Sequence, residues 1–366
     1  MRTVPFYILL VIISVACNKE PFKETSRSFS MGVTPWPPDF SEQGEELAYS
    51  FINSKCDMVT HHFDDGVPWQ EAYDSTAFPQ EIIDNVNKRI SRSHVPKTYL
   101  AIAPLSSSRK GIAGYWNKSA DENIRKIWSE KPMNDTMVIT AYFRFCCYMV
   151  DAFKPDYFNY AVECNSKDWE PAQFNEFVYF CSVIYSKLKA RYPALPVFVS
   201  YMVTLDDGTY ENAKRMNPYS DQISLSSYPY VCTGSFARGS TELTSIPENW
   251  FSKFREIDNS KPFSIAETGY IAEDLDISEW GVSKMGRPEW QADYLQYVFE
   301  TCNTYHAEFV NWFCAYDYDN AYNTMLAAGV AMPLFKEWKD IGFYDGQGMA
   351  RPSLTVWMKW YKAAKN

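Results

Sequence analysis

Short apolar segments alternate with helix-like segments from residue 29 to the C-terminus of this 366-residue chain. The apolar segments are rich in β-branched and aromatic residues, which is typical of buried strands. Eight segments are predicted to be strands: 30–34, 56–61, 98–103, 157–163, 197–202, 222–227, 263–267 and 308–313. The segments between them have the spacing and punctuation of helices, over 44–53, 79–92, 121–128, 137–153, 171–191, 210–215, 246–257 and 289–306.

Strands that alternate with helices pair in parallel through right-handed crossovers. Eight such units predict closure into a single (β/α)8 barrel, a TIM barrel, over residues 29–366. A doubly wound open sheet is the alternative, but no G-x-G-x-x-G sequence follows any of the early strands. We therefore expect an α/β fold with one domain, whose chemistry lies at the C-terminal ends of the strands.

The first residues have the pattern of an export signal. The apolar run 6–15 is too short to span a bilayer, and a small residue and Cys17 follow it. This predicts a lipoprotein signal peptide over 1–16, with Cys17 acylated as the new N-terminus. A simple cleaved secretory signal is the alternative, because Ser14 stands where a leucine is more usual. Residues 17–28 suit a flexible tether, so we expect an exported protein that is lipid-anchored to a membrane, periplasmic or on the cell surface.

Composition narrows the classes of function. The net charge is −10 and no run of lysine or arginine occurs, which argues against a nucleic-acid partner. Aromatic residues make up 17% of the chain, enough for a core and for a cleft in which flat rings stack on sugars. The cysteines form no C-x-x-C pair, so neither a zinc site nor a redox motif is predicted. We expect a monomer without metal or cofactor.

Two of the predicted strands end at a glutamate, namely Glu163 and Glu267. A carboxylate at the end of a buried strand lies at the rim of the core. Strands four and seven stand on opposite sides of an eight-stranded barrel, so their glutamates face each other across its mouth. Two carboxyl groups about 5–5.5 Å apart allow one to attack an anomeric carbon while the other carries the proton. The pair therefore predicts a glycosidase.

Aromatic and polar residues gather in the predicted loops at the same rim, which supports a substrate-binding site there. The candidate rings are Trp36, Trp69, Tyr228 and Trp312. For Trp36 and Trp69, a place in the core is an equally good interpretation. His61 and His62 are adjacent on a predicted strand and point to opposite faces, so at most one of these candidate binding residues enters the site.

These segments resemble clan A of the glycoside hydrolases. In that clan the acid/base glutamate ends strand four and the nucleophile ends strand seven, which implies these roles for Glu163 and Glu267. Residues 266–270, Ala-Glu-Thr-Gly-Tyr, are similar to strand seven of the family 53 endo-β-1,4-galactanases, which implies β-galactan as a substrate. The resemblance also implies that Tyr228 hydrogen-bonds the nucleophile and that the indole of Trp312 floors the −1 subsite.

Two positions depart from the clan's pattern. The asparagine that usually precedes the acid/base, and contacts the substrate 2-hydroxyl, is replaced by Val162, with Asn165 or Asn159 as candidate substitutes. The arginine often found near strand two is missing, and His61-His62 stand in that region. Three hypotheses remain: a retaining hydrolase of β-linked poly- or oligosaccharides, a non-catalytic glycan-binding lipoprotein on a glycosidase barrel, and an inverting glycosidase. The two intact glutamates favour the first.

Overall fold

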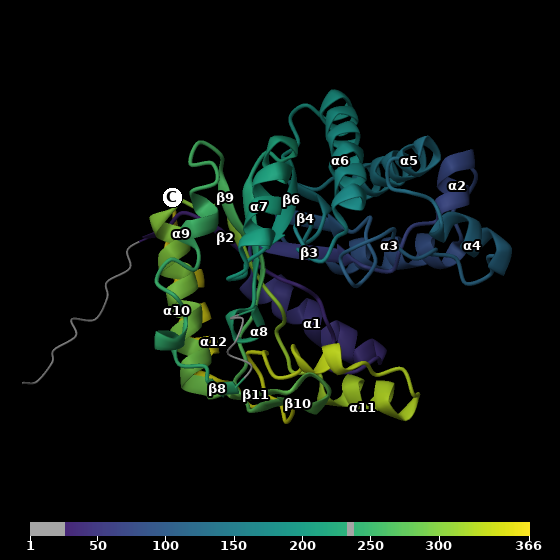
Figure 1. Cartoon of the computed structure of the whole chain (residues 1–366). Coiled ribbons are helices and arrows are strands. Elements are labelled where there is room, and N and C mark those ends of the chain that lie inside the picture. The colour runs from purple at the N-terminus through teal and green to yellow at the C-terminus, as the bar shows by residue number, and fades with distance from the viewer. Residues whose placement is uncertain (1–25, 233–237) are drawn as a thin grey trace, which may run out of the picture.

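The computed structural model of this chain describes residues 26–232 and 238–366, and a closed barrel of parallel strands forms its centre (Figure 1). The barrel order is β12, β2, β3, β4, β5, β6, β7 and β9, so strands that follow one another in the chain are neighbours in the barrel. The strands are β2 (Ser30–Val33), β3 (Met58–Phe63), β4 (Lys97–Ile102), β5 (Tyr157–Ala161), β6 (Val197–Met202), β7 (Ile223–Ser227), β9 (Phe263–Thr268) and β12 (Phe309–Trp312). Each overlaps a predicted strand, and the predicted (β/α)8 barrel is confirmed.

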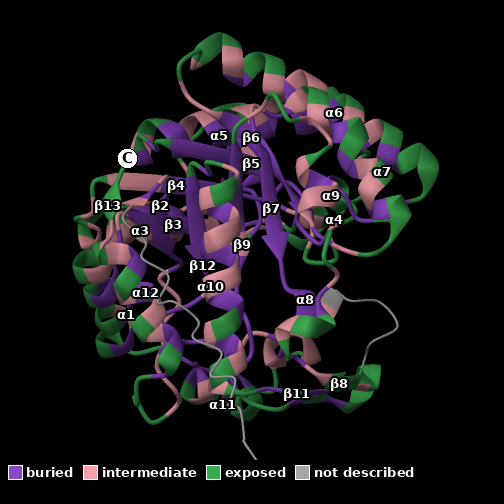
Figure 2. Ribbon diagram, turned by 90° about the vertical axis from the view of Figure 1, so that its left-hand side faces the viewer, coloured by how far each residue is buried: buried purple, intermediate pink, exposed green. Residues whose placement is uncertain are grey.

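Helices surround the barrel and cover its outer face. They are α1 (Glu42–Lys55), α3 (Gln80–Arg92), α4 (Glu122–Ser129), α5 (Thr136–Phe153), α6 (Pro171–Arg191), α7 (Asp207–Met216), α9 (Ser252–Arg255), α10 (Pro288–Thr304) and α12 (Pro352–Lys362). Ser41, Asp135 and Asp206 accept the first backbone N–H groups of α1, α5 and α7, while a proline opens α6, α10 and α12. Figure 2 shows buried residues in the strands and exposed residues on the outer sides of the helices.

Among residues 26–232 and 238–366, one helix has the length and apolar character of a membrane span. It is α5, and half of its residues are buried inside the protein. Its side chains Tyr142 and Phe145 belong to the main hydrophobic core, which lies between the barrel strands and the helices. The apolar composition of α5 therefore follows from its place against the barrel, as expected for the core helix of a globular domain.

The connections after β7, β9 and β12 carry further elements. They are α8 (Pro229–Cys232) and β8 (Arg238–Ser240) after β7, β10 (Leu275–Ile277) and β11 (Val282–Met285) after β9, and α11 (Asp319–Ala327) after β12. β10, β11 and β8 form a small sheet of their own. In Figure 1 this sheet and α11 lie beyond the same end of the barrel. Because they follow the C-terminal ends of strands, these elements build walls around the barrel mouth.

The helix predicted over 246–257 is reduced to the single turn α9. The adjacent side chains of Trp250 and Phe251 are both buried, whereas a surface helix buries one face only. The indole of Trp250 donates a hydrogen bond to Ser227 Oγ at 2.9 Å, which fixes this segment against strand β7. Contacts with the barrel therefore override the local helical pattern.

Both ends of the described chain contain structure that the sequence pattern did not predict. Residues Ser26–Arg27 form β1, which pairs with β13 (Ala364–Lys365), and Arg27 is buried in an ion pair with Asp57. The folded domain thus includes the last residues of the segment 17–28 that was predicted to be a tether. Helix α12 was also unpredicted, as was α2 (Trp69–Asp74). Residues 1–16 and Cys17 lie outside the described residues.

The barrel interior changes from apolar to polar toward the C-terminal ends of the strands. Its apolar layer consists of Tyr99, Tyr157, Phe198 and Phe309, whose ring centroids are 4.7 to 6.1 Å apart. On the mouth side, the amide nitrogen of Asn159 donates to Tyr99 Oη and to Ser200 Oγ, both at 3.0 Å. The Ser200 hydroxyl in turn accepts the backbone N–H of Glu163 at 3.0 Å. The strand ends are thus supported by the apolar layer and by a hydrogen-bonded layer on the mouth side of it.

Candidate active site

Glu163 lies just beyond the end of β5, in a tight turn. Tyr157 and Asn159 face the barrel interior, but the register shifts between Asn159 and Ala161, so Ala161 packs in the outer core. Strand β5 ends at Ala161, two residues earlier than predicted, and Glu163 adopts a left-handed φ of 50°. This conformation costs a non-glycine residue about 1–2 kcal/mol. The hydrogen bond from its N–H to Ser200 offsets part of that cost and fixes the turn that presents the carboxylate.

Two side chains from other strand ends hold the carboxylate of Glu163. The Ser226 hydroxyl, on β7, donates to Oε1 at 2.7 Å, and Arg109 Nε, on the loop after β4, donates to Oε2 at 2.8 Å. The two terminal nitrogens of Arg109 bind both oxygens of Asp64 at 2.9 and 2.8 Å. A bidentate contact of this kind fixes the plane of the guanidinium group. Arg109 therefore ties Glu163 to the loop after β3.

Glu267 lies on β9 and is held by a tyrosine and a histidine. The Tyr228 hydroxyl donates to Oε1 at 2.7 Å, the hydrogen bond predicted from the sequence, and His62 Nδ1 lies 3.2 Å from Oε2. The nearby Gly269 explains how closely these parts pack. A Cβ atom there would lie 2.6 Å from Ile341 Cδ1 and 3.3 Å from the Tyr228 ring. Glycine is therefore required just after the nucleophile candidate.

Ser226 brings the two glutamates to the same place. It is the register partner of Glu267 in the parallel β7–β9 ladder, while its hydroxyl binds Glu163. Neighbouring strands lie about 4.8 Å apart, so the two carboxylates flank one serine. The Tyr228 phenol is influenced by both: its pKa is raised well above the usual value by burial, then by Glu267 and also by Glu163. The structure thus joins the two predicted glutamates in one site.

Charges alternate around this site. Burial would lower the pKa of His62, but Asp64 and Glu267 outweigh it and raise the pKa to about 10, so His62 is an imidazolium at neutral pH. Burial would raise the pKa of Asp64, yet Arg109 and His62 hold it well below its usual range. For Glu267, burial acts upward, and the contacts with His62, Tyr228 and Arg109 keep the pKa below the usual value. Glu267 is therefore ionised at neutral pH.

His61 points away from the mouth, as expected for the neighbour of an inward-facing residue. It is buried, and its ring centroid lies 4.8 Å from that of Phe153. Burial lowers the pKa of His61 to about 3, so the ring is neutral. Of the two predicted binding histidines, the structure brings only His62 to the glutamates.

Asn165 does not occupy the position expected of a substrate-binding amide. It is fully buried, and its amide group donates to the carbonyl oxygens of Met202 and Thr209 at 3.0 and 3.2 Å and accepts the N–H of Met202 at 2.7 Å. These bonds tie the turn after β5 to strand β6. Val162 is also buried, in the hydrophobic cluster of the barrel interior that includes Ala266. Neither position offers a free amide to a sugar.

Two predicted platform residues are core residues instead. Trp312 is completely buried, and its indole donates to the carbonyl oxygen of Ile341 at 3.0 Å. Trp69 is 1% exposed, donates to the carbonyl oxygen of Ala113 at 3.0 Å and stacks on Trp128. A side chain without exposed surface cannot form the floor of a subsite. The prediction that Trp312 contacts the sugar is therefore wrong, and for Trp69 the alternative, a place in the core, is the correct one.

Other rings take the place beside the glutamates. The ring centroid of Phe313 lies 5.8 Å from that of Trp36 and 6.4 Å from that of Trp338. The ring centroid of Trp338 lies 5.9 Å from that of Tyr228. We call Trp36, Phe313 and Trp338 the aromatic wall. All three are half-buried, and within residues 26–232 and 238–366 neither indole N–H has a hydrogen-bond partner. These indole nitrogens are themselves buried, so what the aromatic wall offers to a sugar is the half-exposed surface of its rings, which suits apolar sugar faces.

Several residues that complete the site carried little signal in the sequence. Asp64 belongs to the polar loop after the second predicted strand, so its position at the rim was visible. Arg109 and Ser226 were not singled out, because one lies in an unpatterned loop and the other in an apolar strand. Their contacts with Glu163 bridge 54 and 63 positions of the chain. Only folding brings them together.

A cluster of carboxylates lies near the mouth. Oxygens of Glu273, Asp317 and Asp340 lie within 4.8 Å of one another, so among the described residues these groups are a candidate for holding a cation. Arg351 already pairs with Glu273 and Asp317, and Lys339 pairs with Asp340. These two cations offset most of the charge of the three carboxylates and brace the loops after β9 and β12.

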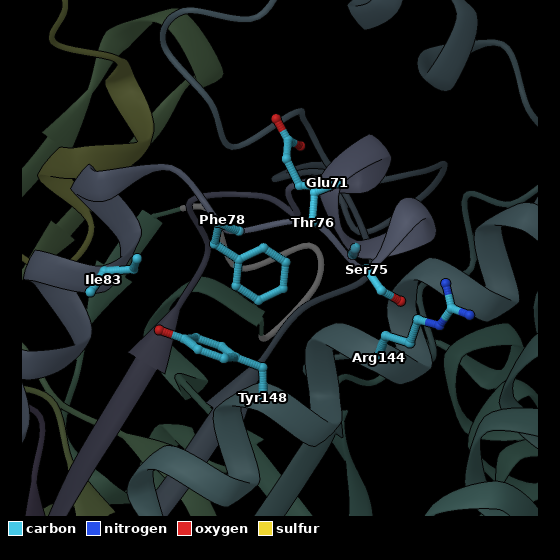
Figure 3. A pocket seen from close by; sticks show the side chains of 9 residues that line it. Glu71, Ser75, Thr76, Phe78, Ile83, Arg144 and Tyr148 are labelled. Carbon is cyan, nitrogen blue, oxygen red and sulfur yellow. The ribbon is translucent and has the colours of Figure 1, made fainter.

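A hollow of about 460 Å³ lies between α2, α3 and α5, away from the glutamates (Figure 3). It is lined by Glu71, Ala72, Ser75, Thr76, Ala77, Phe78, Ile83, Arg144 and Tyr148. The carboxylate of Glu71 is bound by Tyr115 and Asn117, and Arg144 donates to the carbonyl oxygen of Tyr73. Its charged groups thus already have partners, and no residue of the predicted site lines it.

No protein-family model and no curated protein matches the chain. Solved structures share its fold. An exo-β-1,4-mannosidase from Opitutaceae bacterium strain TAV5 is 12% identical with a TM-score of 0.59, over 92% of this chain and 60% of that one. A GH53 catalytic domain from Ignisphaera aggregans is 17% identical with a TM-score of 0.58, over 92% and 97%. An endo-laminarinase from Formosa Hel1_33_131 is 12% identical with a TM-score of 0.54, over 93% and 89%. The chain thus spans about three fifths of the mannosidase, and at these identities the likeness establishes the barrel fold.

Proposed function

We propose that this chain is a retaining glycoside hydrolase that cleaves β-linked poly- or oligosaccharides. One observation carries the proposal: Glu163 and Glu267, from the ends of strands four and seven, flank Ser226 at the barrel mouth. Two carboxyl groups so arranged are the equipment of glycoside hydrolysis. A mannosidase and a laminarinase are among the structures that share the fold, which supports the same class of reaction.

Glu267 is the nucleophile in this proposal. The hydrogen bonds from Tyr228 and His62 fix the carboxylate and keep it ionised, and the nucleophile needs both properties. It attacks the anomeric carbon of the sugar and forms a covalent glycosyl-enzyme intermediate. The positive charge of His62 leaves Glu267 a poor proton donor, so the acid must be the other glutamate.

Glu163 is the acid/base. It protonates the leaving oxygen in the first step and removes a proton from water in the second. The Ser226 hydroxyl orients one carboxylate oxygen, and the aromatic wall offers a stacking surface beside the same mouth. The likeness of residues 266–270 to the family 53 galactanases makes a β-1,4-galactan the first substrate to test.

Loss of catalysis with retained glycan binding is the second candidate. Two observations favour it: both oxygens of Glu163 already accept hydrogen bonds, from Ser226 and Arg109, and the buried Val162 supplies no amide. A glycan panel decides between the candidates. Galactan, mannan, xylan and laminarin are incubated with the protein, and reducing ends and binding are measured in parallel. Cleavage supports the hydrolase, and binding without cleavage supports the second candidate.

Variants of the two glutamates test the mechanism. Glu267→Ala should abolish turnover of every substrate, whereas Glu163→Ala should lose about 10²–10⁴ in rate on substrates with poor leaving groups. With an activated aryl glycoside, Glu163→Ala should still form the intermediate, and added azide should yield a β-glycosyl azide. Azide with Glu267→Ala should yield the α-anomer. Glu248→Ala, at an exposed position, is the matched control and should behave as the wild type.

The first product distinguishes retention from inversion. NMR should show the β-anomer of the sugar appearing first from the wild type. An α-anomer would mean inversion, with the carboxyl groups about 6.5–9.5 Å apart. Full activity in both glutamate variants would end the assignment of catalysis to these residues.

We also propose that the protein is exported, monomeric and anchored by a lipid on Cys17. The support is the pattern of an apolar run followed by a small residue and this cysteine. In cells fed a palmitate analogue, the wild type should become labelled and fractionate with membranes, while Cys17→Ala should do neither. An unlabelled wild type would leave simple secretion as the explanation.

A further inference from the structure

The segment 333–342 forms a fixed part of the mouth. The Tyr318 hydroxyl donates to the carbonyl oxygen of Phe335 at 2.6 Å, and the N–H of Ala272 donates to that of Asp340 at 2.9 Å. These contacts attach the segment to the loops after β12 and β9, respectively. Its side chains are therefore held in defined positions beside the glutamates.

Glu337 is the buried acidic residue at the centre of this segment. It is 6% exposed, and its backbone carbonyl accepts a hydrogen bond from the Tyr230 hydroxyl at 2.6 Å. The next residue, Trp338, packs its ring 5.9 Å from that of Tyr228, whose hydroxyl binds Glu267. Glu337 is thus linked to Glu267 through Trp338 and Tyr228, and it lies on the side of the aromatic wall.

The carboxyl group of Glu337 is close to Glu163 and lacks a partner. Within the described residues no hydrogen bond or ion pair reaches it. Burial, and then the charge of Glu163, raise the pKa of Glu337 to about 8. The group therefore carries a proton at neutral pH and has an O–H donor to offer. This donor is unused within the described residues, so an oxygen atom of a ligand bound at the mouth would be a suitable acceptor for it.

We propose that Glu337 is a substrate-binding carboxylic acid whose O–H donates a hydrogen bond to an oxygen of the sugar bound beside Glu163. Ionised glutamates only accept hydrogen bonds. A neutral Glu337 therefore adds a hydrogen-bond donor that the ionised Glu267 does not supply. The hydroxyl, ring and glycosidic oxygens of a sugar are suitable acceptors. The inference rests on the proposed function, because it places a sugar at this mouth. The proton stays on Glu337 throughout the reaction.

This role makes substrate binding depend on pH. Several titratable groups face or flank Glu337 from the elements packed around it: Glu163, Tyr228, Tyr230, Tyr318, Lys336 and Lys339. Burial raises the pKa values of Tyr228 and Tyr318 well above the usual value, so these phenols stay neutral at pH 9. His62 is the other group of the site that titrates at alkaline pH, and its pKa is about 10. Between pH 7 and 9 the protonated fraction of Glu337 falls about tenfold, and the donor is lost.

Kinetics of the full-length chain test the proposal. The probes are the 2,4-dinitrophenyl β-glycosides of galactose, glucose, mannose and xylose and of their β-1,4-linked disaccharides. The kcat/KM of the wild type should fall about tenfold from pH 7 to pH 9. Glu337→Gln keeps a neutral donor at every pH, so it should retain activity at pH 7 and lose this decline. Glu337→Ala should raise KM about tenfold at pH 7, and Glu248→Gln should follow the wild type. An unchanged alkaline decline in Glu337→Gln would overturn the proposal.

Infrared difference spectroscopy gives a readout that needs no turnover. The wild type should show a protonated carboxyl band at pH 7 that disappears by pH 9, and this band should be weaker in Glu337→Gln by the share of Glu337. Asp317, whose pKa burial raises to about 7, contributes to the band in both proteins. A band equally strong in Glu337→Gln belongs to other groups and refutes the assignment. If the wild type cleaves no probe, the proposed hydrolysis fails, and the infrared band alone decides whether Glu337 holds a proton.

Discussion

Replacement of Tyr228 by phenylalanine removes one of the two hydrogen bonds that hold Glu267. The Tyr228 hydroxyl lies 2.7 Å from Glu267 Oε1, while its ring packs against Tyr230 and Trp338. Phenylalanine keeps that packing and deletes only the oxygen atom. The change therefore leaves the barrel intact, and among the described residues it leaves Glu267 with the contact to His62.

The size of the effect follows from the kind of bond that is lost. A hydrogen bond to a charged group contributes about 1.5–3 kcal/mol, and 1.36 kcal/mol corresponds to a tenfold change in rate. If the bond acts on the transition state, kcat/KM of Tyr228→Phe should fall about 10- to 100-fold. The Tyr228 bond is also one of the contacts that lower the pKa of Glu267. Its loss raises that pKa, so the acidic limb of the rate profile should move to higher pH.

The assay is kcat/KM between pH 4 and 8 on an aryl β-glycoside that the wild type cleaves, with thermal unfolding measured on the same samples. Tyr160→Phe is the matched control, because Tyr160 is a buried tyrosine whose hydroxyl binds the carbonyl oxygen of Tyr219 at 2.8 Å. That variant should lose about 1 kcal/mol of stability and no activity. Wild-type kinetics and an unmoved acidic limb in Tyr228→Phe would refute the view that this hydroxyl sets the state of Glu267.

Three further variants test the placement of other residues. Trp312→Ala should lower the free energy of unfolding by about 3–5 kcal/mol in denaturant titrations, because the indole is completely buried; a loss under 1 kcal/mol would restore it as a subsite residue. Asn165→Ala should cost about 2–4 kcal/mol by the same measurement, since it leaves buried backbone groups unpaired, and Asn165→Asp should cost at least as much, because a buried carboxylate accepts from Met202 but cannot donate to the carbonyl oxygens of Met202 and Thr209. Arg109→Met should lower the melting temperature by an amount equivalent to about 1–2 kcal/mol. This value is kept small because the Asp64 side chain is 40% exposed, so solvent screens its ion pair with Arg109. An unchanged melting temperature would show that the guanidinium contacts contribute little.

Local pattern was sufficient for the barrel and for the two glutamates. Strands of a parallel barrel are buried on both faces, so each appears as a short apolar run whatever the rest of the chain does. The C-terminal end of such a run is also the rim of the mouth, which placed Glu163 and Glu267 correctly. The opposite orientation of His61 and His62 followed from the two-residue period of a strand.

The neighbours of the glutamates depend on the folded chain. Arg109 and Glu337 lie in segments without periodicity, and they reach Glu163 because separate loops converge over the barrel. No local pattern encodes such a meeting. The prediction from the sequence therefore contained the carboxylates of Glu163 and Glu267 and the hydroxyl of Tyr228. It lacked the guanidinium group of Arg109 and the carboxyl group of Glu337.

The sequence by itself determined the fold class, the number of strands and the pair of glutamates at the mouth, since each of these follows from residues close together in the chain. Only the tertiary structure decided which candidate rings and amides are free to bind. Trp312, Trp69 and Asn165 have the residue types of a sugar site, yet distant backbone groups satisfy their polar atoms and close-packed neighbours cover their surfaces. Burial and hydrogen-bond satisfaction are properties of contacts between remote segments, so a one-dimensional pattern does not contain them.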